Sequence, residues 1–113
     1  MIQGLGRVRV WVYNSPVDMR KSYDGLSVIA RESQDLLSGD VFLFVSKDRK
    51  RAKALYWDGT GLNIWMKRLE RGRLADIFLR HQMSVSELRL FFEGSLSVVK
   101  KLSPEDLTSR FRA

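Results

Sequence analysis

The chain has 113 residues, of which 44% are hydrophobic and 29% charged, and it contains no cysteine. This composition predicts one compact globular domain and excludes a multidomain enzyme with a deep cofactor cleft. Without cysteine there is no disulfide framework and no thiolate metal site, and His81 alone cannot build a zinc site, so no metal or cofactor is expected. No apolar run is long enough to cross a membrane and the chain opens without a leader pattern, which predicts a cytoplasmic protein.

The positive charge of the chain is unevenly distributed. The net charge is +7, and residues 46–73 hold nine Lys and Arg against three acidic residues. Such clustering is typical of a surface that binds DNA, because each cation that neutralises a phosphate releases a condensed counterion. The alternative is that the charge only keeps a small domain soluble. The residues predicted to contact DNA are Arg7, Arg9, Arg20, Lys21, Lys47, Arg49, Lys50, Arg51, Lys53, Lys67, Arg68, Arg71 and Arg73.

Residues 7–13 alternate between valine and larger side chains, which predicts a strand. The three valines would face the core. The opposite face carries Arg7 and Arg9 together with Trp11 and Tyr13, a mixture that suits phosphates and exposed bases. Aromatic side chains on a strand also commonly pack against a neighbouring element, so this second interpretation stays open.

A helix is predicted after this strand. Ser15 precedes Pro16, which favours a first helical position, and Asp18 can meet the unpaired amides of the first turn. Apolar residues then recur at three- and four-residue spacings and end at residues 32–34. Gly25 inside this pattern indicates close packing on another element, or a kink.

The middle of the chain predicts three consecutive antiparallel strands. Residues 41–45 are continuously apolar, as in a central strand covered on both faces, and 46–51 form a polar hairpin loop. A second strand at 53–57 leads into the tight turn 58–61, whose glycines allow positive φ, and a third follows at 62–69.

The last third of the chain contains weaker signals. Residues 74–79 form either a further strand or a short edge piece. Ser84 and Glu87 have the spacing of a capping box and introduce a helix that ends at Gly94. Ser103 begins a similar pattern, which predicts a short C-terminal helix.

These elements together predict an α+β fold. It has a small antiparallel sheet of about four to five strands, one helix after the first strand and C-terminal helices. Residues 1–113 would form a single domain, in which 7–80 make the sheet and first helix and 84–113 make a helical segment.

The carboxylates are the main candidates for catalysis. Two-metal phosphoryl transfer needs several of them around shared ions, and Asp18, Asp24, Asp58 and Glu70 are available. Helix capping explains Asp18, an Asp-Gly turn explains Asp58, and Glu70 lies between two arginines. The chain is therefore predicted not to be an enzyme, with a metal-dependent nuclease as the less favoured alternative. His81 is most simply an exposed loop residue.

A series of short motifs, in this order and at these spacings, is specific. The motifs are Ser15–Lys21, Asp24–Leu26, Ser38–Gly39, Phe42–Phe44, Leu55–Gly61 and Trp65–Arg73. They resemble the TnpB-type accessory protein, or second-reading-frame protein, of the IS-sixty-six-type bacterial insertion sequences. The resemblance covers residues 8–73 and continues loosely into 88–94, but departs from the family pattern directly after Arg73.

The resemblance implies a small protein that is encoded beside a transposase and assists transposition. In these elements a separate, larger protein would perform the strand chemistry. The leading hypothesis is therefore a non-catalytic accessory protein that binds DNA through its basic surface and would be nucleoid-associated when bound. The alternative is an interaction module that docks on the transposase, with Trp11, Trp57, Trp65 and Arg68 as anchors. Pairing through a sheet edge would also allow a homo-oligomer.

Overall fold

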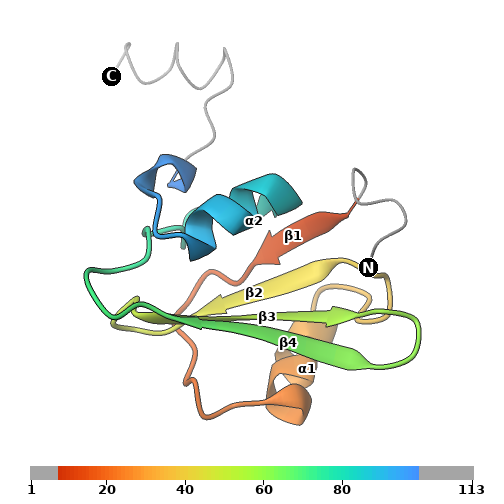
Figure 1. The fold of residues 1–113 in the computed structure, drawn as a ribbon. Coiled ribbons are helices and arrows are strands. Elements are labelled where there is room, and N and C mark those ends of the chain that lie inside the picture. Colours follow the sequence, from red (N-terminus) through yellow and green to blue (C-terminus); the bar gives the residue numbers. More distant parts are fainter. Residues whose placement is uncertain (1–7, 100–113) are drawn as a thin grey trace.

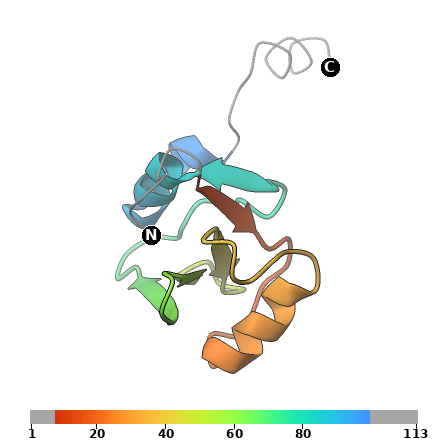
Figure 2. The ribbon, with the colours of Figure 1, turned by 90° about the vertical axis from the view of Figure 1, so that its right-hand side faces the viewer.

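The computed structural model describes residues 8–99 and shows a five-stranded sheet with one helix on each face (Figures 1 and 2). The elements are β1 (Arg9–Val12), α1 (Tyr23–Arg31), β2 (Val41–Val45), β3 (Arg51–Trp57), β4 (Leu62–Arg68), β5 (Gln82–Ser84), α2 (Val85–Phe92) and the short 3-10 helix η2 (Leu96–Val98). The predicted α+β class is confirmed, with one helix after the first strand and a helix near the end of the described residues. Arg7 and the helix predicted from Ser103 lie outside those residues.

The strands β2, β3 and β4 form the predicted antiparallel meander. All five residues of β2 are buried, as its continuous apolar sequence predicts. β3 pairs with β2 on one side and with β4 on the other, from Arg51 opposite Arg68 to Trp57 opposite Leu62. Gly59, in the turn between β3 and β4, has a φ of 103°, which an L-residue rarely adopts. The local signals of turn and alternation therefore place these strands correctly.

The prediction of a wholly antiparallel sheet is wrong, because β1 pairs with β2 in parallel. The sheet order is β4-β3-β2-β1-β5, so β1 lies inside the sheet and β5 forms the edge beside it. The chain leaves β1, passes through α1 and returns to start β2 at the end where β1 starts. Alternation along a strand carries no information about this direction, since it reads the same in parallel and antiparallel pairs.

The segment 74–79 is not a strand. Leu74, Ala75 and Ile77 are buried there without strand pairing, and the fifth strand follows at β5, which pairs antiparallel with β1. The capping box at the start of α2 is confirmed: Ser84 Oγ accepts from the Glu87 amide at 3.1 Å, and Glu87 Oε1 accepts from the Ser84 amide at 3.0 Å.

The first helix begins later than predicted. It starts at Tyr23 with Ser22 at the N-cap, not at Pro16, and it ends at Arg31. Before it, the chain follows the end of β2, where the Val17 amide donates to the Val45 carbonyl at 2.9 Å. This long-range hydrogen bond holds residues 13–21 out of the helix, although Pro16 is compatible with a helical start.

Two apolar cores lie on the two faces of the sheet. On one face, Val10 and Val12 of β1 pack with Leu88 and Phe91 of α2. On the other face, Phe42 and Phe44 of β2 pack with Leu26 and Ala30 of α1. Both alternating faces of β1 and β2 are therefore covered, one by α2 and the other by α1 (Figure 2).

Candidate nucleic-acid interface

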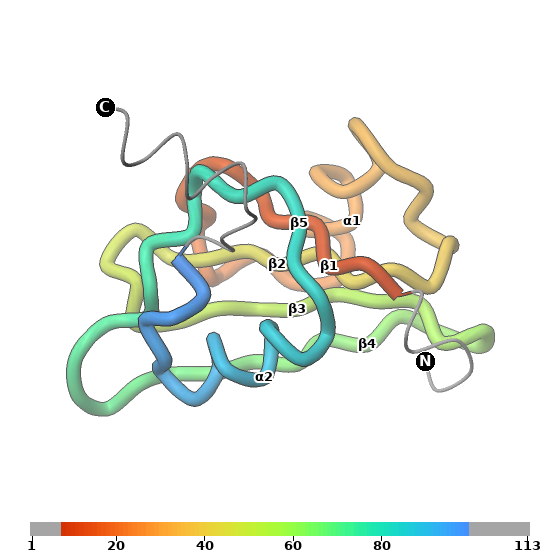
Figure 3. Tube along the Cα trace, turned by 90° about the horizontal axis from the view of Figure 1, so that it is seen from above, coloured from red at the N-terminus to blue at the C-terminus, as the bar shows by residue number. Residues whose placement is uncertain are grey.

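Three segments meet at one end of the sheet. They are residues 17–21 before α1, the loop 46–50 between β2 and β3, and residues 69–73 after β4 (Figure 3). The Leu69 amide donates to the Lys50 carbonyl at 2.8 Å, and the Leu74 amide donates to the Arg49 carbonyl at 2.6 Å. We call the surface that these segments form with the adjoining ends of β3 and β4 the basic end; its ten cations are Arg20, Lys21, Lys47, Arg49, Lys50, Arg51, Lys67, Arg68, Arg71 and Arg73.

Part of this charge is compensated locally. Arg20 forms an exposed ion pair with Asp18, at 2.7 Å between Nη2 and Oδ2. Hydrogen bonds from the side chain and the backbone of Arg20 lower the pKa of Asp18 to about 2. Arg68 forms a second exposed pair with Glu70 at 2.9 Å. Such exposed pairs are screened by water and leave the guanidinium groups accessible to a stronger anion.

The loop 46–50 is shaped by its own side chains. Asp48 accepts from Ser46 Oγ at 2.6 Å and from the Lys50 amide at 3.0 Å, and these hydrogen bonds lower the pKa of Asp48. Arg49 has a φ of 57°, in the left-handed region, and its guanidinium lies 3.7 Å from the carboxylate of Asp76. The loop therefore presents Lys47 and Lys50 outward, while Arg49 is turned toward the following segment.

Five exposed cations of the basic end make no ion pair within residues 8–99. They are Lys21, Lys47, Lys50, Arg71 and Arg73. Lys47 and Arg73 also line an open groove of ≈ 690 Å³ together with Arg51, between residues 16–19 and the loop 46–50. Cations from two separate segments thus converge on one concavity.

Two cations of the basic end are paired on neighbouring strands. Arg51 of β3 is directly opposite Arg68 of β4. Like charges at directly opposed positions destabilise a sheet, and Glu70 offsets this only from the exposed side. Solubility alone does not require such a pair, whereas a bound polyanion would turn the repulsion into a favourable contact.

Lys53 does not contribute to this surface. Its side chain is buried, and Nζ donates to the carbonyl oxygens of Met19 at 2.8 Å and Lys21 at 2.7 Å. Lys53 therefore fixes residues 19–21, which carry Arg20 and Lys21, instead of contacting solvent. The alanines on either side of Lys53 are both fully buried.

Arg9 lies at the end of the sheet opposite the basic end. Its amide donates to Asp40 Oδ1 at 3.1 Å, and its guanidinium lies 5.9 Å from the ring centroid of Trp11. Trp11 Nε1 donates to Asp40 Oδ2 at 3.0 Å. Asp40 thus ties the start of β1 to the start of β2, a role that no local sequence signal indicates.

The three tryptophans do not share a surface. Trp11 and Trp57 are partly buried on the face of the sheet that α1 covers. Trp65 of β4 lies on the other face, packed edge-on against Phe92 of α2 at 4.8 Å between ring centroids. Its side chain is 45% exposed, so Trp65 is the tryptophan most accessible to a partner.

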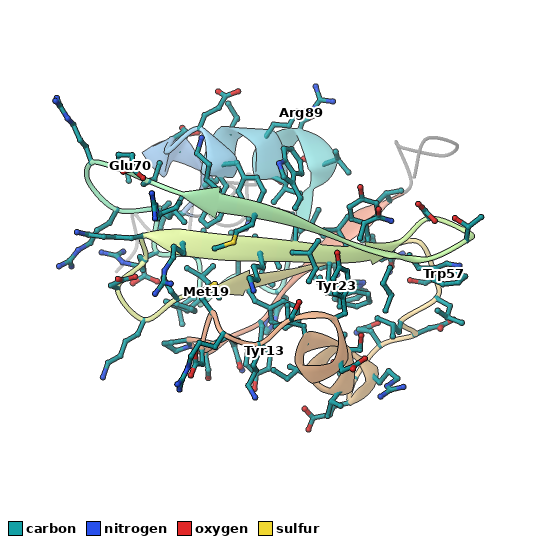
Figure 4. The ribbon with its side chains drawn as sticks, turned by 60° about the horizontal axis from the view of Figure 1, so that its bottom comes forward. Tyr13, Met19, Tyr23, Trp57, Glu70 and Arg89 are labelled. Atoms are coloured by element: carbon teal, nitrogen blue, oxygen red, sulfur yellow. The ribbon has the colours of Figure 1, made fainter. Side chains whose placement is uncertain are left out.

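The candidate catalytic carboxylates are spread over the molecule. Asp58 lies in the turn after Trp57, at the opposite end of the sheet from Glu70 (Figure 4). Asp18 is paired with Arg20, and Asp24 lies in the first turn of α1. Within the described part of the chain, no three His, Asp or Glu side chains are placed to hold a metal ion. Asp18, Asp24, Asp58 and Glu70 therefore do not meet at one site.

Asp58 instead organises the turn between β3 and β4. Its Oδ1 accepts from the amides of Thr60 at 2.9 Å and Gly61 at 3.0 Å, and its Oδ2 accepts from Asn63 Nδ2 at 2.9 Å. These hydrogen bonds, that of the Thr60 amide first, hold the pKa of Asp58 well below its ordinary value of 3.8.

The first prediction concerns the pH dependence of this turn. Since the pKa of Asp58 is lower in the folded state, its stabilisation is fully present above pH 3.8 and is lost as the pH falls toward the folded-state pKa. Asp58→Ala should therefore lower Tm at neutral pH, and the difference from the parent should shrink below pH 3.8. Thermal unfolding followed by circular dichroism at several pH values measures this. A difference that stays constant down to acid pH would contradict the assignment.

Comparison with known proteins identifies the family. The model of a family described as IS66 Orf2 like protein matches residues 8–101, and the chain belongs to this family. Two curated relatives from Sinorhizobium fredii, the uncharacterized proteins y4jC and y4hO, are each 35% identical over 68 residues. These matches cover 58% of this chain and 58% and 59% of the relatives, so the chain spans less than two thirds of their length. No solved structure matches the chain.

The family confirms the resemblance and associates the chain with insertion sequences. The match continues well past Arg73, so the departure from the motif pattern at that position does not end the likeness. Among residues 8–99, no helix is long and apolar enough to cross a membrane.

Proposed function

We propose that this chain is a non-catalytic accessory protein of transposition that binds DNA through the basic end and assists a separately encoded transposase. The observation that carries the proposal is the convergence of three segments, distant in sequence, on one surface with ten cations. Membership of an insertion-sequence family supplies the context.

The chemistry of the basic end favours the phosphate backbone over the bases. Lys47, Lys50, Arg71 and Arg73 are long side chains on loops, and such contacts position a protein on DNA without reading its sequence. The groove beside Arg51 offers a further place for a phosphate oxygen. Each phosphate that a cation neutralises adds about 0.9 to the slope of log affinity against log salt.

The second prediction tests this surface with two matched double variants. Lys47→Ala/Lys50→Ala removes two cations from the basic end. Arg9→Ala/Arg31→Ala removes the same charge from exposed positions elsewhere. In a fluorescence anisotropy titration of duplex DNA over several salt concentrations, the first variant should reduce the salt slope by about two units. The second should leave it nearly unchanged.

Two results would contradict the proposal. One is no binding of the parent to duplex DNA in dilute salt. The other is an equal loss in both double variants, which would mean that only net charge matters and not the basic end.

A second candidate function is docking on the transposase, which the exposed indole of Trp65 favours. Trp65 borders a groove of ≈ 430 Å³ with Lys67, Arg89 and Phe92. Co-purification with the transposase that resists nuclease and high salt, and that Trp65→Ala abolishes, would support this function over DNA binding. Loss of the complex on nuclease treatment would count against it.

A further inference from the structure

β4 is an edge strand of unusual regularity. It has seven residues and pairs with β3 through its whole length without a bulge, and it contains no proline. Its outer side has no strand neighbour within residues 8–99. An edge of this kind presents a row of unpaired amide and carbonyl groups that can pair with another strand.

The backbone groups that face outward can be identified from the ladder. The Leu69 amide donates inward to Lys50, and Asp58 donates to the Gly61 carbonyl at the other end of the pair. Hydrogen-bonded and non-hydrogen-bonded positions alternate in an antiparallel pair. The backbone amides and carbonyls of the odd-numbered residues of β4 therefore point toward β3. The even-numbered residues therefore direct their amides and carbonyls outward; they are Leu62, Ile64, Met66 and Arg68.

The centre of this edge is apolar and exposed. Trp65 is 45% exposed and Met66 47%, and residues 62–66 carry no charge. Natural edge strands are commonly protected by charges, prolines or bulges. In β4 the only charges are Lys67 and Arg68, both at the end of the strand that meets the basic end.

The strand is complementary to a second copy of itself. In an antiparallel pair centred on Trp65, Ile64 of one copy lies opposite Met66 of the other, and Leu62 lies opposite Arg68. All four are outward-facing positions, so the two strands can exchange hydrogen bonds along their full length. The two Trp65 side chains then lie opposite each other in a non-hydrogen-bonded position, where aromatic pairs stabilise a sheet.

The charge of the chain selects this antiparallel arrangement. It places no cation opposite another cation, and it puts the two basic ends at opposite ends of the joined sheet. A parallel pair would bring the two basic ends side by side, where they repel. We propose that β4 is the interface between two copies of this chain, which form one continuous sheet through their β4 edges. This inference rests on the geometry of the edge and on the distribution of charge, and it does not require DNA binding.

The third prediction is a dimer that a single proline dissociates. Met66→Pro removes an outward-facing amide, and proline is tolerated at the free side of an edge strand. In sedimentation equilibrium without DNA, the parent should show a concentration-dependent dimer and Met66→Pro a monomer with an unchanged circular dichroism spectrum. A small strand-to-strand interface predicts a weak, reversible dimer. The control is Leu79→Ser, which removes an exposed apolar side chain elsewhere and should leave the dimer intact.

A cross-link tests the register independently, because the chain has no natural cysteine. In Trp65→Cys the two Cα atoms would lie about 4.5 Å apart, within the range that a disulfide spans. In Asn63→Cys they would lie about 14 Å apart, from an offset of four residues at about 3.3 Å each and the spacing between the strands, and cannot be bridged. Mild oxidation should therefore yield disulfide-linked dimer rapidly in the first variant only.

Two outcomes would overturn the proposal: a parent that remains monomeric at every concentration, or a dimer that persists in Met66→Pro and shows no preference between the two cysteine positions. Neither depends on DNA binding, so the two proposals fail separately.

Discussion

Replacing Arg80 with leucine should lower the free energy of unfolding by about 3 kcal/mol, because it breaks a largely buried ion pair. The Arg80 side chain is only 9% exposed, and its Nη1 donates to Glu87 Oε2 at 2.7 Å and to the Val98 carbonyl at 3.1 Å. Its Nη2 donates to the Gln82 carbonyl at 2.8 Å. One guanidinium thus joins β5, α2 and η2, and leucine would leave the Glu87 carboxylate with less compensation for its burial.

Urea unfolding at neutral pH measures this effect. Arg89→Leu is the matched control, since Arg89 is exposed on α2 and should change the stability by no more than about 0.5 kcal/mol. A loss below about 1 kcal/mol in Arg80→Leu would mean that water replaces the guanidinium and that Arg80 does not hold β5, α2 and η2 together.

Replacing Lys53 with methionine should cost about 2–3 kcal/mol, because two backbone carbonyls lose a charged donor. Methionine keeps the length and apolar packing of the side chain, so the change isolates the ammonium group. The carbonyls of Met19 and Lys21 would lose Lys53 Nζ as their hydrogen-bond donor. Hydrogen exchange at the Val17 amide should then accelerate, because that segment is held to β2 by few other contacts.

The control is Lys50→Met, which removes an exposed ammonium group from the adjacent loop. It should leave the stability nearly unchanged while weakening DNA binding. If Lys53→Met lost DNA affinity without any loss of stability or change in exchange, Lys53 would be a direct contact and its positioning role would be wrong.

The elements that the sequence predicts correctly are those with local causes. The continuous apolar run of β2, the turn at Asp58 and the capping box at Ser84 each depend on residues within a few positions of one another. The direction of β1 and the start of α1 depend on contacts with β2 that are distant in sequence. Propensity therefore placed a helix start at Pro16, and tertiary hydrogen bonds displaced it to Tyr23.

The residues of the candidate site also differ in whether local or distant contacts place them. The cations of 46–73 lie together because a short hairpin and its neighbouring strand bring them to one end of the sheet. Arg9 and Lys53 are predicted from the sequence to contact DNA because they are basic, but Arg9 lies at the other end of the sheet and Lys53 is buried. The one local clue is that Lys53 shares a face of β3 with Leu55, which is buried. The acceptors of the Lys53 ammonium group are the carbonyls of Met19 and Lys21, which are distant in sequence.

The central position of β1 has a consequence for synthesis of the chain. β1 leaves the ribosome before both of its neighbours, since β2 follows only after residues 13–40 and β5 only after residues 13–81. At about 5–20 residues per second, β1 waits roughly 1–6 seconds for its first partner. During that time Val10 and Val12 have no sheet to join, so the nascent chain exposes an apolar strand until β2 emerges.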